Sequence, residues 1–118
     1  MNAAIVDTDV VSSPHHGRLL GISFMSLAEL ERWPLERAWG PWRKAELGRH
    51  LANYTVLPVN RELCRKWAEV SFAAKSHGQP IQTADAWIAA SAIYYHVPPI
   101  TNNGSDYSMV RDLIVLSA

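Results

Sequence analysis

The stretch TADAWIAASAIYYHVPPITNNGSDY, residues Thr83–Tyr107, decides how the rest of the chain is organised. Its first half has apolar residues at helical spacing and predicts a helix over Thr83–His96, with the opening threonine as N-cap. Val97–Ile100 then has the length and β-branched content of a short buried strand, followed by a polar loop that carries Asp106. With Asp85 in the first turn of the helix, two carboxylates are expected at the carboxyl edge of a parallel sheet, where open α/β sheets bind ligands.

The composition is that of a globular domain without a general attraction for polyanions. The 118 residues support one domain with a modest core, and a content of 48% hydrophobic and 19% charged residues excludes a disordered chain. No apolar run approaches the ~20 residues of a membrane-spanning helix. The 11 basic residues balance the 11 acidic ones; if four acids surrounded a metal, 11 basic against 7 acidic residues would remain to attract phosphate.

The N-terminus and the cysteine content indicate a reducing compartment. AAIVDTDVV has neither the basic region nor the apolar length of a signal peptide, so a cytoplasmic location is expected. The single cysteine, Cys64, excludes an intrachain disulfide. Its place beside Leu63 and Trp67 in a helical pattern predicts a buried structural thiol.

Two further acids follow predicted strands near the N-terminus. Ala3–Val6 is a short buried-strand candidate, and Asp7, Thr8 and Asp9 come directly after it. Leu19–Phe24 is the second strand candidate. The next helix starts with a capping box, in which Ser26 is the N-cap and Glu29 follows three residues on; this alone would explain Glu29 structurally. Pro34 is expected to end or kink that helix at Trp33.

The remaining elements continue the alternation of helices and strands. Short apolar strands that alternate with helices indicate a parallel α/β sheet, here in a single domain over residues 1–118. The predicted elements are one or two helical pieces over Leu35–Asn53, a strand over Thr55–Pro58, a helix from the cap Asn60 to Ser76, a helical turn from the cap Ser105 to Val110, and a last strand over Leu113–Leu116.

Two groups of side chains allow a structural and a functional interpretation. Trp39 and Trp42 lie in a helical segment with a basic face, where base stacking is conceivable, but packing in the core or in a dimer is the favoured role. His15 and His16 invite a metal interpretation; since adjacent residues point apart in most backbones, a solvated loop is favoured.

The four acids share one position relative to the predicted sheet. Asp7, Glu29, Asp85 and Asp106 all follow strands or open helices at its carboxyl edge. Four carboxylates crowded there would repel one another, and a cation would stabilise them as anions. Oxygen ligands without a cysteine or paired-histidine signature indicate Mg²⁺ or Mn²⁺.

Four segments in this order resemble the PIN-domain ribonucleases of the VapC type, the toxins of toxin–antitoxin pairs. They are IVDTDVV at 5–11, ISFMSLAELERW at 22–33, TADAWIAASAI at 83–93 and ITNNGSDY at 100–107. The resemblance implies a three-layer α/β/α sandwich, endonucleolytic cleavage of RNA, a small antitoxin that blocks the groove, and a homodimer. It implies one or two Mg²⁺ or Mn²⁺ ions, with these site residues: metal-binding acids Asp7, Glu29, Asp85 and Asp106, and supporting polar groups Thr8, Asp9, Thr101 and Asn102.

The segment between Asp7 and the second strand is shorter than in similar proteins, which carry at least one helix there. Only Thr8–Gly21 is available, so one wall of the groove is expected to be reduced. An alternative function is therefore a catalytically impaired PIN-fold binding module. A receiver-like signalling domain is a third hypothesis. It is weakened because Asn60 stands where a phosphoacceptor aspartate would follow the TVLP strand, and no lysine follows a late strand.

Overall fold

The computed structural model describes residues 3–10 and 19–118. Within these ranges the chain forms one parallel sheet of five strands, in the order β3-β2-β1-β4-β5. The strands are β1 (Ala3–Val6), β2 (Leu19–Ile22), β3 (Thr55–Val56), β4 (Pro99–Thr101) and β5 (Leu116–Ser117). The prediction of a parallel α/β sheet is confirmed.

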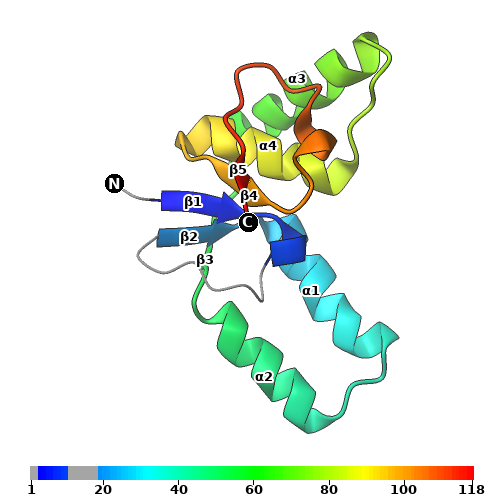
Figure 1. Cartoon of the computed structure of the whole chain (residues 1–118), viewed down its shortest axis with the longest axis vertical. Helices are drawn as coiled ribbons and strands as arrows, with labels where there is room; N and C mark the ends of the chain where they lie inside the picture. The colour runs from blue at the N-terminus through cyan, green and yellow to red at the C-terminus, as the bar shows by residue number, and fades with distance from the viewer. Residues whose placement is uncertain (1–2, 11–18) are drawn as a thin grey trace.

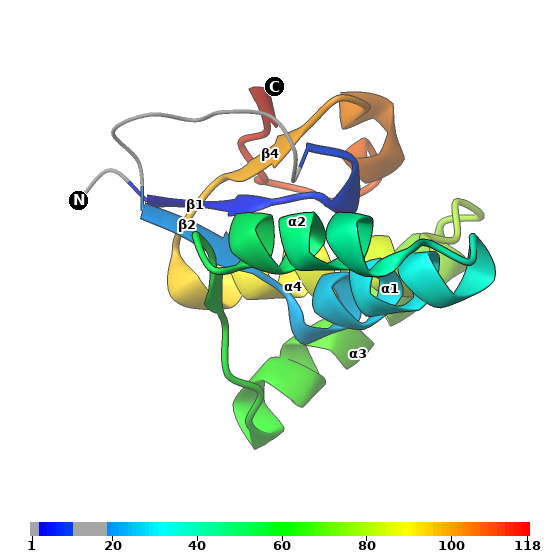
Figure 2. The same ribbon diagram turned by 90° about the horizontal axis from the view of Figure 1, so that it is seen from below.

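Helices cover both faces of this sheet, which confirms the three-layer arrangement. Figure 1 shows α3 and α4 above the strands and α1 and α2 below them, and Figure 2 views the molecule from the side of α1 and α2. The α1–α2 pair extends away from the sheet along the longest dimension, 45 Å. The helices are α1 (Phe24–Glu36), α2 (Pro41–Leu51), α3 (Arg61–Ser76) and α4 (Thr83–Tyr95), with short 3₁₀ helices η1 (Thr8–Val10) and η2 (Gly104–Tyr107).

The central strand β1 is buried on both faces. Successive side chains of a strand point to opposite sides. Ala4 and Val6 therefore pack in a cluster with Leu30 of α1, while Ile5 packs in a second cluster with Ile88 of α4. This placement fixes β1 in the middle of the molecule and brings its carboxyl end, where Asp7 follows, between the two helical layers.

The start of α1 differs from the prediction. β2 ends at Ile22 rather than Phe24, and Ser23 is the N-cap; its Oγ accepts hydrogen bonds from the backbone N–H of Met25 (3.1 Å) and Ser26 (3.2 Å). The assignment of Ser26 as N-cap was wrong. Because the helix starts three residues earlier, Glu29 lies in its second turn and cannot complete a capping box.

α1 also continues further than predicted. Pro34 is buried inside the helix, which runs to Glu36 instead of ending at Trp33. The expected interruption at Gly40 is confirmed, since Gly40 is the N-cap of α2 with a proline at the first helical position. In α3, Asn60 is confirmed as the N-cap, but Cys64 is exposed, so the prediction of a buried thiol was wrong.

The later elements keep their predicted order with shifted ends. The N-cap of α4 is Gln82, without a side-chain bond, so Thr83 is the first helical residue rather than the cap. The N-cap of η2 is Asn103 rather than Ser105. β4 begins at Pro99 instead of Val97, because the N–H of Val97 bonds to Ala92 O (3.0 Å) and closes α4. The strand predicted over Thr55–Pro58 is shorter in the structure and forms β3. The strand predicted over Leu113–Leu116 begins later and forms β5.

The segment after β1 is described only at its two ends. Thr8–Val10 form η1, and Leu19 starts β2. His15 and His16, for which the sequence favours a solvated loop, lie outside the described residues. Among the described residues, no helix combines the length and hydropathy needed to cross a membrane.

The cap assignment predicts a difference between two serine substitutions. Ser23→Ala removes two hydrogen bonds at a buried helix start and should lower the free energy of unfolding by about 1–2 kcal/mol. Ser108→Ala, at an exposed serine after η2, should change it by less than about 0.5 kcal/mol. Urea unfolding followed by circular dichroism measures both; equal effects would contradict Ser23 as the cap.

Candidate active site

Asp7 is the most firmly held acid of the site. It follows β1, is only 7% exposed, and its backbone N–H bonds to Ile100 O of β4 (2.9 Å). Its Oδ2 accepts hydrogen bonds from Thr101 Oγ1 (2.9 Å) and from the Tyr107 hydroxyl (2.7 Å). Because both donors reach the same oxygen, Oδ1 receives no hydrogen bond from the described residues and is left to accept from a ligand.

Tyr107 is a site residue that sequence reasoning missed. Its side chain is 2% exposed at the end of η2, and its hydroxyl reaches Asp7 across 100 positions of the chain. Burial first, and then the charge of Asp7, raise its pKa far above the ordinary value, so the hydroxyl stays protonated and donates. The only available signal was its place at the end of ITNNGSDY, since a buried tyrosine hydroxyl usually needs a partner.

All four acids predicted from the sequence line one pocket of about 290 Å³ at the carboxyl edge of the sheet. Asp7 comes from the end of β1, Glu29 from the second turn of α1, Asp85 from the first turn of α4, and Asp106 from η2. The other residues that line it are Thr8, Asp9, Trp33, Gln82 and Ala84. Trp33, Gln82 and Ala84 were not predicted as site residues.

The predicted supporting groups take different places. Thr8 and Asp9 line the pocket, and Thr8 Oγ1 donates to Ser26 Oγ (3.0 Å), which links η1 to α1. Thr101 lies behind Asp7 and acts on it through the hydrogen bond described above. Asn102 does not line the pocket; its side-chain amide donates to Asp9 O (3.3 Å) and ties the end of β4 to η1.

Asp106 is oriented by its own loop. Asn103 Nδ2 donates to Asp106 Oδ1 (3.0 Å), and Ser105 Oγ donates to Asn103 Oδ1 (2.7 Å). By contrast, the side chain of Glu29 makes no hydrogen bond or ion pair with another described residue. Its capping role is excluded, and its side chain is available to the pocket.

The acids repel one another, and the effect is seen most clearly at Asp85. Its pKa is raised to about 6, first by burial and then by the nearby charges of Asp7, Asp106 and Glu29. The pKa of Asp9 is also raised, by burial and then by Asp7. The ion pairs among the described residues join Arg32 to Glu36 and Lys66 to Glu69, and neither involves a pocket acid.

The donor set is chemically suited to a hard divalent cation. Carboxylate oxygens are the ligands that Mg²⁺ and Mn²⁺ prefer, and a cation would offset the repulsion that raises the pKa of Asp85. In their present positions, however, no three carboxylate, imidazole or thiol groups among the described residues converge as a ready coordination cluster. A cation held by three of these acids would require their side chains to move toward it.

The protein is therefore an α/β/α sandwich with four acids in one pocket at the carboxyl edge of its parallel sheet. Residues 4–111 match the model of the PIN domain, so the chain belongs to the PIN-domain family. It is similar to ribonuclease VapC5 of Mycobacterium tuberculosis, with 29% identity over 112 residues that cover 86% of this chain and 83% of that protein. It is likewise 29% identical to ribonuclease VapC1 of Haemophilus influenzae over 98 residues, which cover 80% and 70% of the two chains.

Solved structures of toxin–antitoxin systems share the fold. The chain superimposes on VapBC-5 of Mycobacterium tuberculosis with a TM-score of 0.77 at 23% identity and full coverage of both chains. Against VapBC2 of Rickettsia felis, solved bound to a promoter DNA fragment, the TM-score is 0.85 at 18% identity, with 98% of each chain covered. The resemblance to VapC-type PIN domains is confirmed, and the receiver-like hypothesis finds no support in these matches.

The raised pKa of Asp85 predicts that the metal-free protein loses folding stability as the pH rises. In the unfolded chain Asp85 releases its proton near its ordinary pKa of 3.8, whereas the folded protein keeps it up to about pH 6. Stability therefore falls as pH rises between these values. Asp85→Asn should stabilise the protein at pH 7.5 by about 1–2 kcal/mol, a value reduced for solvent screening, and by almost nothing at pH 4.

Urea unfolding of both proteins in EDTA at the two pH values measures this effect. Glu62→Gln, at an exposed acid of α3 outside the pocket, is the matched control and should leave the pH dependence unchanged. A destabilising effect of Asp85→Asn at pH 7.5 would contradict the raised pKa of Asp85 that burial and the neighbouring acids produce.

A second prediction concerns the hydroxyl of Tyr107. Tyr107→Phe removes a buried hydrogen bond to a charged group and should lower the free energy of unfolding by about 1.5–3 kcal/mol. Tyr94→Phe is the control, because its hydroxyl accepts a more exposed bond from Asn60 Nδ2 (2.9 Å) and should cost less than about 1 kcal/mol. Similar losses of unfolding free energy in both variants would show that the hydrogen bond to Asp7 stabilises the protein no more than the exposed bond of Tyr94.

Proposed function

We propose that this protein is a metal-dependent endoribonuclease and the toxin of a type II toxin–antitoxin pair, located in the cytoplasm. The observation that carries the proposal is the pocket that Asp7, Glu29, Asp85 and Asp106 line together. Among the described residues, no basic side chain forms an ion pair with these acids. The family match and the similarity to two proteins named as ribonucleases support the same activity.

The proposed cofactor is Mg²⁺ or Mn²⁺, as one or two ions. Asp7, Asp85 and Asp106 would hold it, with Glu29 acting directly or through water. When bound, the cation would lower the pKa of a coordinated water and offset the charge that develops on the phosphate. Thr8 and Asp9 would contribute polar groups at the rim of the pocket.

The main contribution of the other residues near the site would be to hold the acids in position. Thr101 and Tyr107 would hold the Asp7 carboxylate in place through hydrogen bonds to one of its oxygens. Asn102 holds η1 against the end of β4, which keeps Asp9 close to Asp7. In-line attack of water on the RNA phosphorus would leave a 5′-phosphate and a 3′-hydroxyl.

The proposed partners are an RNA substrate, a small antitoxin and a second copy of this chain. The similar solved structures are toxin–antitoxin complexes, which supports an antitoxin partner. A segment of the antitoxin would lie in the groove and cover the acids.

A catalytically impaired binding module is the alternative. It is favoured by the shortened segment after Asp7 and by the absence of a ready three-ligand cluster among the described residues. Calorimetric titration with Mn²⁺ followed by RNA cleavage distinguishes the two functions: metal binding without cleavage would favour the module.

The nuclease proposal predicts the effect of removing one charge from the pocket. Asp7→Asn keeps the shape of the side chain and should lower the rate of RNA cleavage in Mg²⁺ by about 100-fold or more. Glu62→Gln removes an acid outside the pocket and should stay within about twofold of the wild type. Chelation with EDTA should abolish cleavage, and end-group analysis should find 5′-phosphates.

Cleavage by Asp7→Asn at the wild-type rate would refute the assignment of Asp7.

A further inference from the structure

A second pocket adjoins the acids, between α1 and α2. It has a volume of about 320 Å³ and shares Thr8, Asp9 and Trp33 with the acid pocket. Its other lining residues are Leu30, Trp39, Arg43, Glu46, Leu47 and His50. A strand of RNA whose phosphate lies at the acids would therefore have this pocket next to it.

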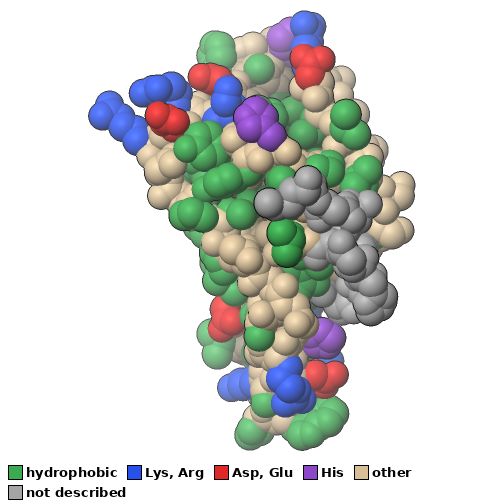
Figure 3. Space-filling view, turned by 90° about the vertical axis from the view of Figure 1, so that its left-hand side faces the viewer, with side chains coloured by type: hydrophobic (Ala, Val, Ile, Leu, Met, Phe, Trp, Pro, Cys, Tyr) green, Lys and Arg blue, Asp and Glu red, His purple; other side chains and the backbone are tan. Residues whose placement is uncertain are grey.

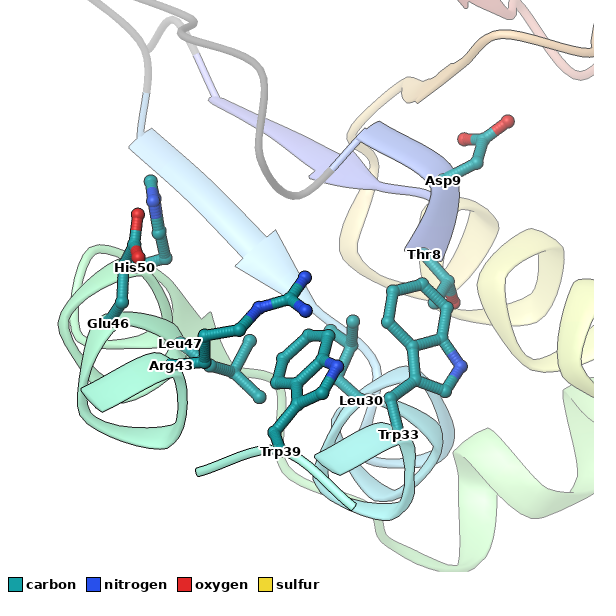
Figure 4. Close-up of a pocket in the computed structure, with 9 residues that line it drawn as sticks. All are labelled: Thr8, Asp9, Leu30, Trp33, Trp39, Arg43, Glu46, Leu47 and His50. Atoms are coloured by element: carbon teal, nitrogen blue, oxygen red, sulfur yellow. The ribbon is translucent and has the colours of Figure 1, made fainter. Parts of the chain in front are cut away.

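The chemistry of the second pocket suits a nucleobase. Figure 4 shows the Arg43 guanidinium across the Trp39 ring, 4.2 Å from its centroid, and Trp33 beside Thr8, while Asp9 points away. Arg37 lies over the Trp33 ring in the same way, at 4.8 Å. Tryptophan faces and guanidinium planes both stack on bases, and such stacking tolerates any base.

The segment on the α2 side of this pocket is basic, although the pocket itself is lined by Asp9 and Glu46 as well as by Arg43. Residues 37–53 carry four basic side chains and one acidic side chain, a net charge of +3, in a chain whose total is zero. Figure 3 shows Lys, Arg and His side chains at the end of the molecule where α2 lies, among acidic and hydrophobic ones. A phosphate chain that approaches the acids would be attracted along this side.

We propose that the pocket between α1 and α2 binds one nucleotide of a single-stranded RNA next to the scissile phosphate, with its base stacked on Trp39 and Arg43. This inference rests on the proposed nuclease function. A volume of about 320 Å³ is at the lower end of small-ligand sites and fits a single nucleotide. Trp33 lines both pockets and would therefore lie between this base and the acids.

Binding and cleavage are tested separately. Binding is measured by fluorescence anisotropy with the full-length Asp7→Asn protein in Mg²⁺. The two probes are a labelled ten-nucleotide oligouridine and an abasic ribose-phosphate chain of the same length. We expect oligouridine to bind about tenfold more tightly than the abasic chain, as one or more stacked bases would give. Trp39→Ala should remove most of that difference without weakening the abasic chain by more than about twofold.

Two further variants complete the experiment. Trp42→Ala, at a tryptophan of the same helical hairpin that is 73% exposed and does not line this pocket, should leave both affinities within about twofold. Trp39→Leu keeps an apolar side chain for folding, which thermal unfolding verifies, and should lose the preference for bases as Trp39→Ala does.

The outcomes separate this proposal from the nuclease function. Equal binding of the two probes, or an unchanged preference in Trp39→Ala, would overturn the base site and leave the pocket to a protein partner. If the Asp7→Asn protein shows a Trp39-dependent preference but the wild type does not cleave RNA, the nuclease function fails while the base site stands. If the wild type cleaves RNA but the Asp7→Asn protein binds both probes equally, the base site fails while the nuclease function stands.

Discussion

The hydrogen bonds to one oxygen of Asp7 are the constraint around which the candidate site is built. Thr101 from β4 and Tyr107 from η2 both donate to Oδ2, and β4 is the immediate neighbour of β1 in the sheet. The central position of β1 buries Asp7, and these donors replace the water that burial removes. The other three acids line the same pocket as this carboxylate, which two hydrogen bonds hold in place.

Much of the fold could be predicted because strands and helices have distinct hydrophobic periods. The order of elements and the parallel sheet follow from that pattern, but the helix starts do not. Ser23 and Ser26 both precede an apolar helical run, and only Ser26 has a glutamate three residues later. The chain uses Ser23 because β2 ends at Ile22, which is determined by pairing with neighbouring strands. Cys64 was misplaced because adjacent helix positions differ by about 100°, so a buried Leu63 does not imply a buried neighbour.

The four acids could be predicted as one group because each stands at the end of a strand or the start of a helix. Their roles remain a proposal. Tyr107 could not be predicted, because its bond to Asp7 depends on how η2 folds back over β1. The second pocket was also hidden from the sequence. Trp33 lies in α1 and Trp39 in the segment that connects α1 to α2, and only the packing of these elements shows that Trp33 is shared with the acids.

The central claim is that mutual repulsion among these carboxylates prepares them for a divalent cation. The most direct test is a crystal of the wild-type protein soaked in millimolar Mn²⁺, with the anomalous difference map calculated at the manganese edge. We expect a peak among Asp7, Asp85 and Asp106, with the side chains drawn closer together than they are here. A map with no peak in this pocket, in a crystal that takes up Mn²⁺ elsewhere, would contradict the claim.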